Sequence, residues 1–183
     1  MDRKVPLHAI WLQQDDPRKN TVVRAAKHNK VTLHKEIRRL PRKGIILEPL
    51  CGKVFGPEDH SILANGGAIV GLDCSWEQIE PSVNKVMRTT KLKPRMLPLL
   101  LAANPVNWGK AFKMTTAEAI AATLYLAGRE SQARDLLASF RWGEQFFKLN
   151  AEPLEAYASA KSSKELVQMQ FEFFDIEVED DES

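Results

Sequence analysis

The stretch Gly66–Trp76, GGAIVGLDCSW, decides the fold of this 183-residue chain. It opens with a glycine pair, continues as the most apolar run of the first half, and closes on polar residues at Asp73–Ser75. A short apolar run between turn formers predicts a strand buried on both faces, as in a parallel sheet covered by helices. Because Gly66 and Gly67 precede this strand, they favour a turn over a phosphate-binding loop.

Further strands and helices alternate around this run in the first half of the chain. Apolar runs at Leu7–Leu12 and Gly44–Pro49 predict two more strands, and Val31–His34 predicts a short one. Asp16-Pro17 and Gly56-Pro57 are helix-start signals. Strands separated by helices imply right-handed crossovers and a parallel sheet, so we expect an α/β fold.

The second half has mainly helical patterns. Thr115–Glu118 has the spacing of a capping box and predicts a helix that runs to Gly128. Apolar residues between Ala133 and Phe140 recur at helical spacing, and Ser162 begins a last helix. The segment Met96–Gly109 joins the halves, and its period fits strand and helix equally.

Charge divides the chain into three parts. The whole chain has 26 Lys+Arg and 24 Asp+Glu, but residues 175–183 contain six acids and no base. Residues 1–95 carry 18 bases and 10 acids, and residues 96–174 carry eight of each. We therefore expect a basic α/β domain at 1–95, a helical domain at 96–174 and a disordered acidic tail at 175–183.

The basic excess lies in two runs that predict a polyanionic partner. Residues 18–43 contain ten bases and one acid, and residues 85–95 contain five bases and no acid. Because phosphate neutralisation dominates nonspecific nucleic-acid affinity, RNA or DNA is the simplest partner. A solvated charged surface is the alternative.

Several classes of protein and site are excluded or not indicated. The chain has no apolar run long enough to span a membrane and no signal peptide, so we expect a cytoplasmic protein without a membrane partner. Cys51 and Cys74 lack zinc-site spacing and are expected to be reduced. We expect no metal, because no His has a ligand partner at i+2 or i+4. Walker and dinucleotide-binding motifs are absent from the sequence.

Polar residues follow several of the predicted strands. They occur at Asp73–Trp76, Ala102–Gly109, Leu47–Pro49 and Asp15–Pro17. Because ligands of open parallel sheets bind beyond the carboxyl ends of strands, these segments could line one cleft. Taken singly, Trp76 would more often be a core residue and Asp73 a helix cap.

At these segments the chain resembles a known family. The matching stretches are DPRKNT (Asp16–Thr21), GIILEPLCGKVFGPED (Gly44–Asp59), Gly66–Trp76, Met96–Gly128, and FRWGEQFFKLNAEPLEAYASA (Phe140–Ala160). The fourth of these begins with MLPLLLAANPVNWG. In order and spacing they resemble the Tsr3 family of small-subunit rRNA aminocarboxypropyltransferases, in an archaeal-type form.

This resemblance implies a fold and an activity. The fold would be an N-terminal parallel-sheet domain plus a C-terminal all-helical domain, SPOUT-like with a deep trefoil knot. The reaction would move the 3-amino-3-carboxypropyl group of S-adenosylmethionine to N3 of a pseudouridine, which can carry a methyl group on N1. The partner would be small-subunit rRNA or the pre-ribosomal small subunit, and we expect a monomer.

The resemblance also assigns roles to individual residues. Asp73 would be the general base or position the target base. The cofactor would be surrounded by Thr21, Leu47, Pro49, Leu72, Trp76, Leu97, Leu100, Phe112 and Thr116. For the RNA backbone we expect contacts from Lys19, Arg24, Arg38, Arg39, Lys91 and Arg95. Two positions depart from the family pattern: Trp108 stands where Tyr is common, and Asn20 where Cys is frequent.

Other interpretations remain open at this point. Asp73 could serve only as a helix cap. The chain could instead be a SPOUT-type rRNA methyltransferase, which presents the methyl carbon to the nucleophile. It could also be a noncatalytic assembly factor that binds pre-rRNA through its basic half.

Overall fold

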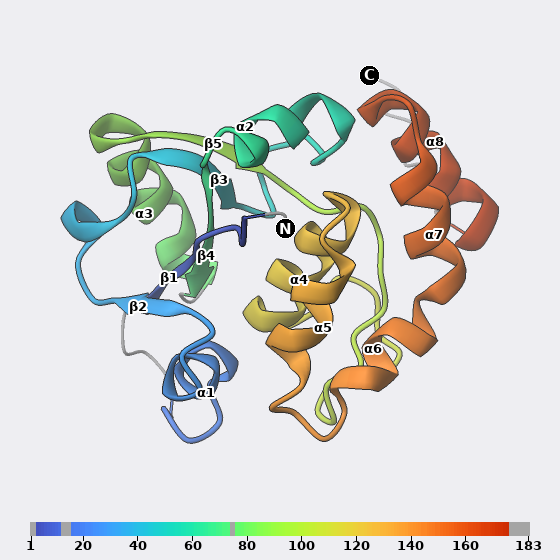
Figure 1. Cartoon of the computed structure of the whole chain (residues 1–183), viewed down its shortest axis with the longest axis horizontal. Coiled ribbons are helices and arrows are strands. Elements are labelled where there is room, and N and C mark those ends of the chain that lie inside the picture. Colours follow the sequence, from blue (N-terminus) through green and yellow to red (C-terminus); the bar gives the residue numbers. More distant parts are fainter. Residues whose placement is uncertain (1–2, 12–15, 74–75, 176–183) are drawn as a thin grey trace.

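A single parallel sheet forms the centre of the protein (Figure 1). The computed structural model describes residues 3–11, 16–73 and 76–175. The strands run in the order β2-β1-β4-β3-β5, and all their pairings are parallel. Their bounds are β1 Leu7–Trp11, β2 Thr32–His34, β3 Lys43–Leu47, β4 Ala68–Asp73 and β5 Lys91–Arg95. The run that was predicted as the most buried strand is β4, the middle strand of the five.

Helices cover both faces of the sheet. The first half contributes α1 Thr21–Lys27, α2 His60–Ala64, α3 Trp76–Thr89 and the 3₁₀ turns η1 Ile37–Arg39 and η2 Pro57–Asp59. The second half contributes α4 Thr116–Leu126, α5 Glu130–Leu137, α6 Gly143–Leu149, α7 Ala151–Ser159 and α8 Ser163–Phe173. Figure 1 shows the layers from left to right as α3, the sheet, α4 with α5, and α7 with α8. The predicted α/β class with a parallel sheet is confirmed.

The core has two parts, one on each face of the sheet. Ile45 and Ile69 face a large cluster that includes Ile120 of α4 and extends through the C-terminal helices. The neighbouring strand residues Ile46 and Val70 face a smaller cluster on the α3 side. Successive strand residues thus pack on opposite faces, as the pleat of a strand requires. The helical half and the sheet share one continuous core.

Close contact between α4 and β4 depends on a glycine. A Cβ atom at Gly71 would lie 2.5 Å from Cγ2 of Thr116 and 3.1 Å from Cδ1 of Ile120. Both distances are shorter than an ordinary van der Waals contact, and Thr116 is the first residue of α4. Gly71 therefore sets how closely the N-terminus of α4 approaches the carboxyl end of β4.

Two elements differ from the sequence prediction. Helix α1 begins at Thr21 rather than directly after Pro17, because the Asn20 side chain caps it. Strand β5 was not predicted, because its sequence KLKPR lacks an apolar run and buries mainly Leu92 and Arg95. An edge strand tolerates Lys and Pro, since one side of its backbone has no strand neighbour.

The expected SPOUT-like fold with a deep trefoil knot is corrected by the structure. A knot requires one part of the chain to thread through a loop of another part, which is rare in proteins. Across the described residues, the strand order and pairings define an α/β sheet with covering helices, and a knot is not shown. The expectation rested on resemblance alone, since neither periodicity nor spacing carries information on threading.

Some sequence predictions fall outside the described residues. They include Cys74, Ser75 and Asp15, and all of the acidic tail beyond Asp175. Cys51 is described and has a free thiol, which lies 3.5 Å from the Lys53 carbonyl oxygen. In the described part of the chain, no helix is both long and apolar enough to span a membrane.

We predict that Gly71→Ala destabilises the protein by about 1–3 kcal/mol, because the added methyl group must displace the start of α4. The measurement is the free energy of unfolding from urea denaturation.

A second substitution provides the control. Thr116→Ser removes the Cγ2 that the new methyl group would meet and keeps the hydroxyl group. The double variant Gly71→Ala/Thr116→Ser should therefore recover much of the lost stability. Equal stability of Gly71→Ala and the wild type would contradict the close-packing argument.

Candidate active site

An apolar cleft of about 340 Å³ lies at the carboxyl ends of β3, β4 and β5. The sheet supplies one wall and the segment leading into α4 supplies the other. The lining residues are Leu47, Glu48, Pro49, Leu72, Arg95, Met96, Leu97, Pro98, Leu100, Phe112, Met114, Thr115, Thr116 and Ala119. This is the edge at which open parallel sheets bind ligands, and the volume lies in the range of small-molecule sites.

The structure brings most of the predicted cofactor contacts together in this cleft. Seven of the nine line it, namely Leu47, Pro49, Leu72, Leu97, Leu100, Phe112 and Thr116. Thr21 lies beside it, because its hydroxyl oxygen accepts a hydrogen bond from the Ala117 amide of α4 at 3.3 Å. Trp76 is the first residue of α3, and its side chain is outside the described part of the structure.

A second cavity, of about 480 Å³, lies at the amino ends of β1 and β2, next to α5. It includes Lys30, whose ammonium group pairs with Asp135 at 2.7 Å. None of the predicted site residues lines this cavity. We therefore place the functional site in the smaller, more apolar cleft.

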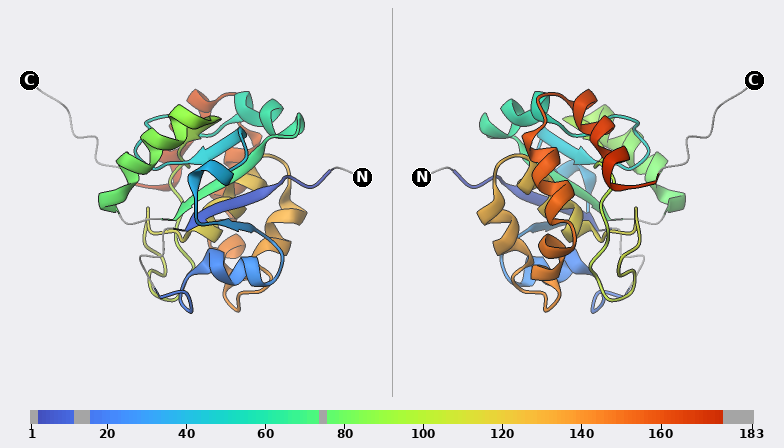
Figure 2. Two further views of the ribbon diagram at one scale, coloured as in Figure 1. Left: turned by 90° about the vertical axis from the view of Figure 1, so that its left-hand side faces the viewer. Right: turned by 90° about the vertical axis from the view of Figure 1, so that its right-hand side faces the viewer.

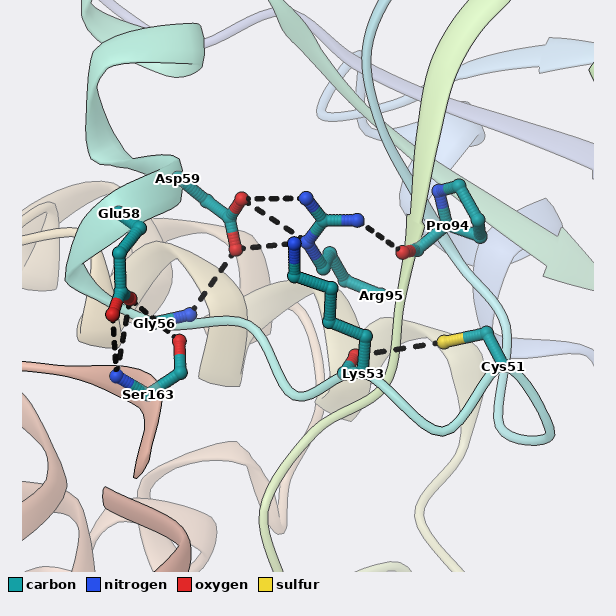
Figure 3. Close-up of polar contacts among 8 residues, drawn as sticks. All are labelled: Cys51, Lys53, Gly56, Glu58, Asp59, Pro94, Arg95 and Ser163. Atoms are coloured by element: carbon teal, nitrogen blue, oxygen red, sulfur yellow. Dashed lines mark hydrogen bonds and ion pairs between the residues drawn. The ribbon is translucent and has the colours of Figure 1, made fainter. Parts of the chain in front are cut away.

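One wall of the cleft is fixed by a buried ion pair (Figure 3). The Arg95 guanidinium donates from Nε to both carboxylate oxygens of Asp59 at 3.0 Å and from Nη1 to the Pro94 carbonyl at 2.7 Å. Both side chains are at most one-tenth exposed. The Arg95 guanidinium is therefore held by partners inside the protein rather than presented to solvent.

The same corner joins the sheet to the last helix. Figure 3 shows Glu58 and Ser163 next to the Asp59–Arg95 pair. The Glu58 carboxylate accepts hydrogen bonds from the Ser163 hydroxyl at 2.6 Å and from its backbone amide at 3.0 Å. These hydrogen bonds keep the pKa of Glu58 below its usual value. Helix α8 is thereby attached to η2 near the end of β5.

The apolar run after β5 is held by side chains of the C-terminal half. Asn150 exchanges two hydrogen bonds with the backbone of Leu101, at 2.8 and 2.9 Å. The Leu99 amide donates to Gln170 at 2.7 Å, and the Leu99 carbonyl accepts from the Tyr157 hydroxyl at 3.0 Å. Burial raises the pKa of Tyr157, so this hydroxyl remains a donor. The helical half therefore fixes the apolar run of the cleft.

Glu118 organises the other wall. Its side chain is fully buried at the N-terminus of α4. One carboxylate oxygen accepts from the amides of Ala103 at 2.6 Å and Asn104 at 3.1 Å. The other accepts from the Thr115 amide at 2.7 Å and the Asn104 side-chain amide at 3.0 Å. Four donors and the positive end of the α4 dipole compensate the buried charge.

Asp73 lies where the N-termini of α1 and α4 meet. Asn20 accepts from the amides of Val22 and Val23 through Oδ1, at 3.0 and 3.1 Å, so its NH₂ group points the other way. That NH₂ group donates to one carboxylate oxygen of Asp73. The Thr116 hydroxyl lies 3.4 Å from the other oxygen. The Asp73 carboxylate is thus positioned next to a residue that lines the cleft.

The predicted RNA contacts lie in separate places. Lys19 is exposed just before α1. The Arg24 guanidinium donates a hydrogen bond to the Ser139 carbonyl oxygen at 2.9 Å. Arg38 and Arg39 are exposed on η1, and both pair with Glu36. Lys91 is exposed at the start of β5, at the other end of the sheet from the cleft. Lys19 follows β1 and therefore lies at the same end of the sheet as the cleft.

A histidine pair lies on the face of the sheet that carries η1. The rings of His8 and His34 stack with centroids 5.1 Å apart, and their facing nitrogens are 2.8 Å apart. Burial is the main cause that lowers the pKa of both imidazoles. These rings are therefore mostly neutral at neutral pH, and the positive charge of this face comes from Lys and Arg.

Several residues that shape the site could not be predicted from the sequence. Glu118 was recognised only as the last residue of a capping box, which gave no sign of its bonds to Ala103 and Asn104. Asn150 and Tyr157 had no detectable signal, because their partners are backbone groups about fifty residues away in sequence. Met114 and Thr115 could have been inferred only from their place next to Thr116.

Together these features define an α/β protein with a mostly apolar cleft of small-molecule size and a positioned carboxylate beside it. Residues 45–174 match the model of the family described as "Ribosome biogenesis protein, C-terminal". The chain is 43% identical over 171 residues to the 16S rRNA aminocarboxypropyltransferase of Methanosarcina acetivorans, covering 92% of this chain and 94% of the relative. It is 40% identical over 160 residues to the enzyme of that name from Methanocaldococcus jannaschii, covering 87% and 91%.

A solved structure agrees with these sequence relatives. The SAM-dependent rRNA:acp-transferase Tsr3 of Vulcanisaeta distributa superposes with a TM-score of 0.78 at 37% identity, covering 88% of each chain. This chain therefore belongs to the Tsr3 family of 16S rRNA aminocarboxypropyltransferases. The structural likeness is to Tsr3 rather than to a SPOUT methyltransferase, so the expected SPOUT-like knotted fold is wrong.

We predict that Glu118→Gln destabilises the protein by about 2–5 kcal/mol, because the new NH₂ group would face buried donors that lose their acceptor. Chemical denaturation measures the loss. As a matched control, Glu172→Gln on the exposed surface of α8 should change stability by less than about 0.5 kcal/mol. A Glu118→Gln variant as stable as the wild type would show that the carboxylate is not essential to this wall.

Proposed function

We propose that this protein transfers the 3-amino-3-carboxypropyl group of S-adenosylmethionine to N3 of a pseudouridine in small-subunit rRNA, during ribosome biogenesis. The N1 atom of that pseudouridine can already carry a methyl group. The observation that carries the proposal is the convergence of seven predicted cofactor contacts in one cleft, in a chain of this family. The named relatives are 16S rRNA aminocarboxypropyltransferases, and the solved Tsr3 is SAM-dependent.

The cleft suits the cofactor chemically. The side chains of Leu47, Leu72 and Leu97 provide apolar walls of the kind that bind an adenine ring. The N-terminus of α4, at Thr115 and Thr116, borders the same cleft.

Selectivity for the larger group is a question of orientation. The sulfonium of S-adenosylmethionine activates three carbons, and a methyltransferase presents the methyl carbon. In this proposal Leu47 and Trp76 hold the methyl group on the apolar side, so that Cγ of the methionine chain faces the RNA. The indole of Trp76 would also attract the sulfonium, by about 0.5–2 kcal/mol.

In this proposal Asp73 is the general base that accepts the proton of N3. The N3–H of a uracil ring is weakly acidic, so N3 becomes a better nucleophile as its proton passes to a carboxylate. The new bond joins N3 to Cγ, the bond from Cγ to sulfur breaks, and its electron pair remains on sulfur as a neutral thioether. Asn20 and Thr116 contact the carboxylate and hold it in place for this transfer.

The RNA must present its base in an unpaired form. N3 lies on the Watson–Crick edge, so the base must leave its pair or come from a loop. Exposed Lys and Arg side chains would bind the phosphates of the RNA backbone. They include Lys19, Arg38, Arg39 and Lys91. We further propose that the protein acts in the cytoplasm as a monomer.

Isotope transfer tests the proposed function. The protein is incubated with small-subunit rRNA and with S-adenosylmethionine labelled either in the carboxyl carbon or in the methyl carbon. Carboxyl label should enter the RNA and methyl label should not. Methyl label in the RNA would identify a methyltransferase, and no transfer from either form would favour a noncatalytic assembly factor.

We predict that Asp73→Asn keeps cofactor affinity and loses turnover by about 100-fold or more, because the amide cannot accept the N3 proton. Calorimetry measures the affinity for S-adenosylmethionine, and transfer of the carboxyl label to RNA measures turnover. Asn caps a helix as well as Asp does, so this variant separates catalysis from capping. Asp135→Asn, on α5 at the second cavity, is the control that should retain full turnover. Full activity of Asp73→Asn would return Asp73 to a structural role.

A further inference from the structure

The loop of residues 102–113, at the rim of the cleft, exposes large apolar side chains. Figure 2 shows this yellow-green segment as a loop at the margin of the molecule, outside the helical layers. Val106 is 84% exposed, Trp108 52% and Phe112 64%. Single exposed apolar residues are common on protein surfaces, but three within seven residues of one loop are a local concentration that indicates binding.

The loop holds these side chains in place through its own hydrogen bonds. The Ala102 amide donates to the Lys110 carbonyl at 3.0 Å, and the Gly109 amide donates to the Ala102 carbonyl at 2.7 Å. Leu101 and Ala111 form an antiparallel bridge at its base. At its tip, the Asn107 amide donates to the Asn104 side chain at 3.0 Å. The exposed rings are therefore presented by a closed loop with internal hydrogen bonds.

Phe112 has an uncommon backbone conformation. Its φ is +58°, in the left-handed region that bulky residues rarely adopt. Such a conformation costs of order 1–3 kcal/mol, and strained residues of this kind cluster at functional sites. Here it accompanies a ring that lines the cleft and remains mostly exposed. Burial of the Phe112 ring in the core does not explain this conformation.

The charge of this region favours an anionic partner. Residues 96–117 contain no acid and two bases, Lys110 and Lys113. The next acid is Glu118, whose carboxylate is fully buried. Aromatic rings interleaved with cations bind single-stranded nucleic acid, since bases stack on the rings while phosphates meet the charges. A purely apolar partner would not need the lysines.

We propose that Trp108 and Phe112 form a stacking platform for the unpaired RNA bases next to the modified nucleotide. This inference rests on the proposed function and adds how the substrate is recognised. A base that leaves its helix loses stacking on its neighbours, and the two rings would replace that contact beside the cleft. Leu50, 65% exposed after β3, lies next in sequence to the cleft residue Pro49 and extends the apolar surface there.

Binding of two charge-matched oligomers tests the platform. The probes are an oligouridylate of about twelve nucleotides and an oligomer of equal length and charge with abasic sites in place of bases. The wild type should bind the oligouridylate more tightly. Trp108→Ala should weaken oligouridylate binding by roughly 5-fold to 100-fold and leave abasic binding nearly unchanged. The loss should be similar at low and high salt, whereas the effect of Lys110→Ala should shrink as salt rises.

Two matched variants complete the design. Trp108→Tyr keeps an aromatic face and should restore most of the affinity. Phe171→Ala removes an aromatic ring of the same exposed fraction, 52%, on α8 and should have no effect. Calorimetry with S-adenosylmethionine on each variant verifies that the cleft is intact.

The outcomes separate this inference from the proposed function. If the wild type transfers the labelled group to rRNA but Trp108→Ala binds oligouridylate as the wild type does, the platform is wrong. Equal wild-type affinity for the two oligomers would also overturn it. A wild-type dimer that becomes monomeric on Trp108→Ala would assign the rim to a contact between copies. A wild type that neither binds RNA nor transfers the group would overturn the proposed function itself.

Discussion

The buried carboxylate of Glu118 is the interaction on which the cleft most depends. It accepts four hydrogen bonds, two of them from backbone amides at Ala103 and Asn104, fourteen or fifteen residues before it. Because these donors are buried, the loop before α4 must keep its conformation whenever α4 is formed. The same contact fixes the start of α4, which borders the cleft and contacts Asp73 through Thr116. The conformation of the site is therefore coupled to that of the helical half.

The sheet contributes the complementary constraint. Its strands are parallel, so the carboxyl ends of β3, β4 and β5 meet at one edge and carry Leu47, Leu72 and Arg95 there. Helix packing against β4 is close because Gly71 has no side chain. A polar pair, Asn20 and Asp73, then lies at the junction of sheet, α1 and α4. An apolar cleft with one positioned carboxylate beside it suits a reaction in which orientation of the cofactor decides which carbon is transferred.

The sequence predicted the parts of this structure that depend on local pattern. Strand β4 and the capped start of α4 follow from apolar runs and turn or cap residues, and the cleft residues followed from resemblance to a family. Strand β5 was missed because an edge strand needs no apolar run. The start of α1 was misplaced because the cap at Asn20 is stronger than the Pro17 signal. The burial of Arg95 could not be predicted because its partner Asp59 is distant in sequence. The expected knot was wrong because threading leaves no local pattern.

We propose that the cleft presents Cγ of S-adenosylmethionine, rather than its methyl carbon, to the RNA. The co-product reports this directly, because each carbon leaves a different thioether behind. One turnover of the wild-type protein with small-subunit rRNA, analysed by liquid chromatography and mass spectrometry, identifies it. We expect 5′-methylthioadenosine, formed in equal amount to the modified nucleoside. S-adenosylhomocysteine as the co-product would contradict it.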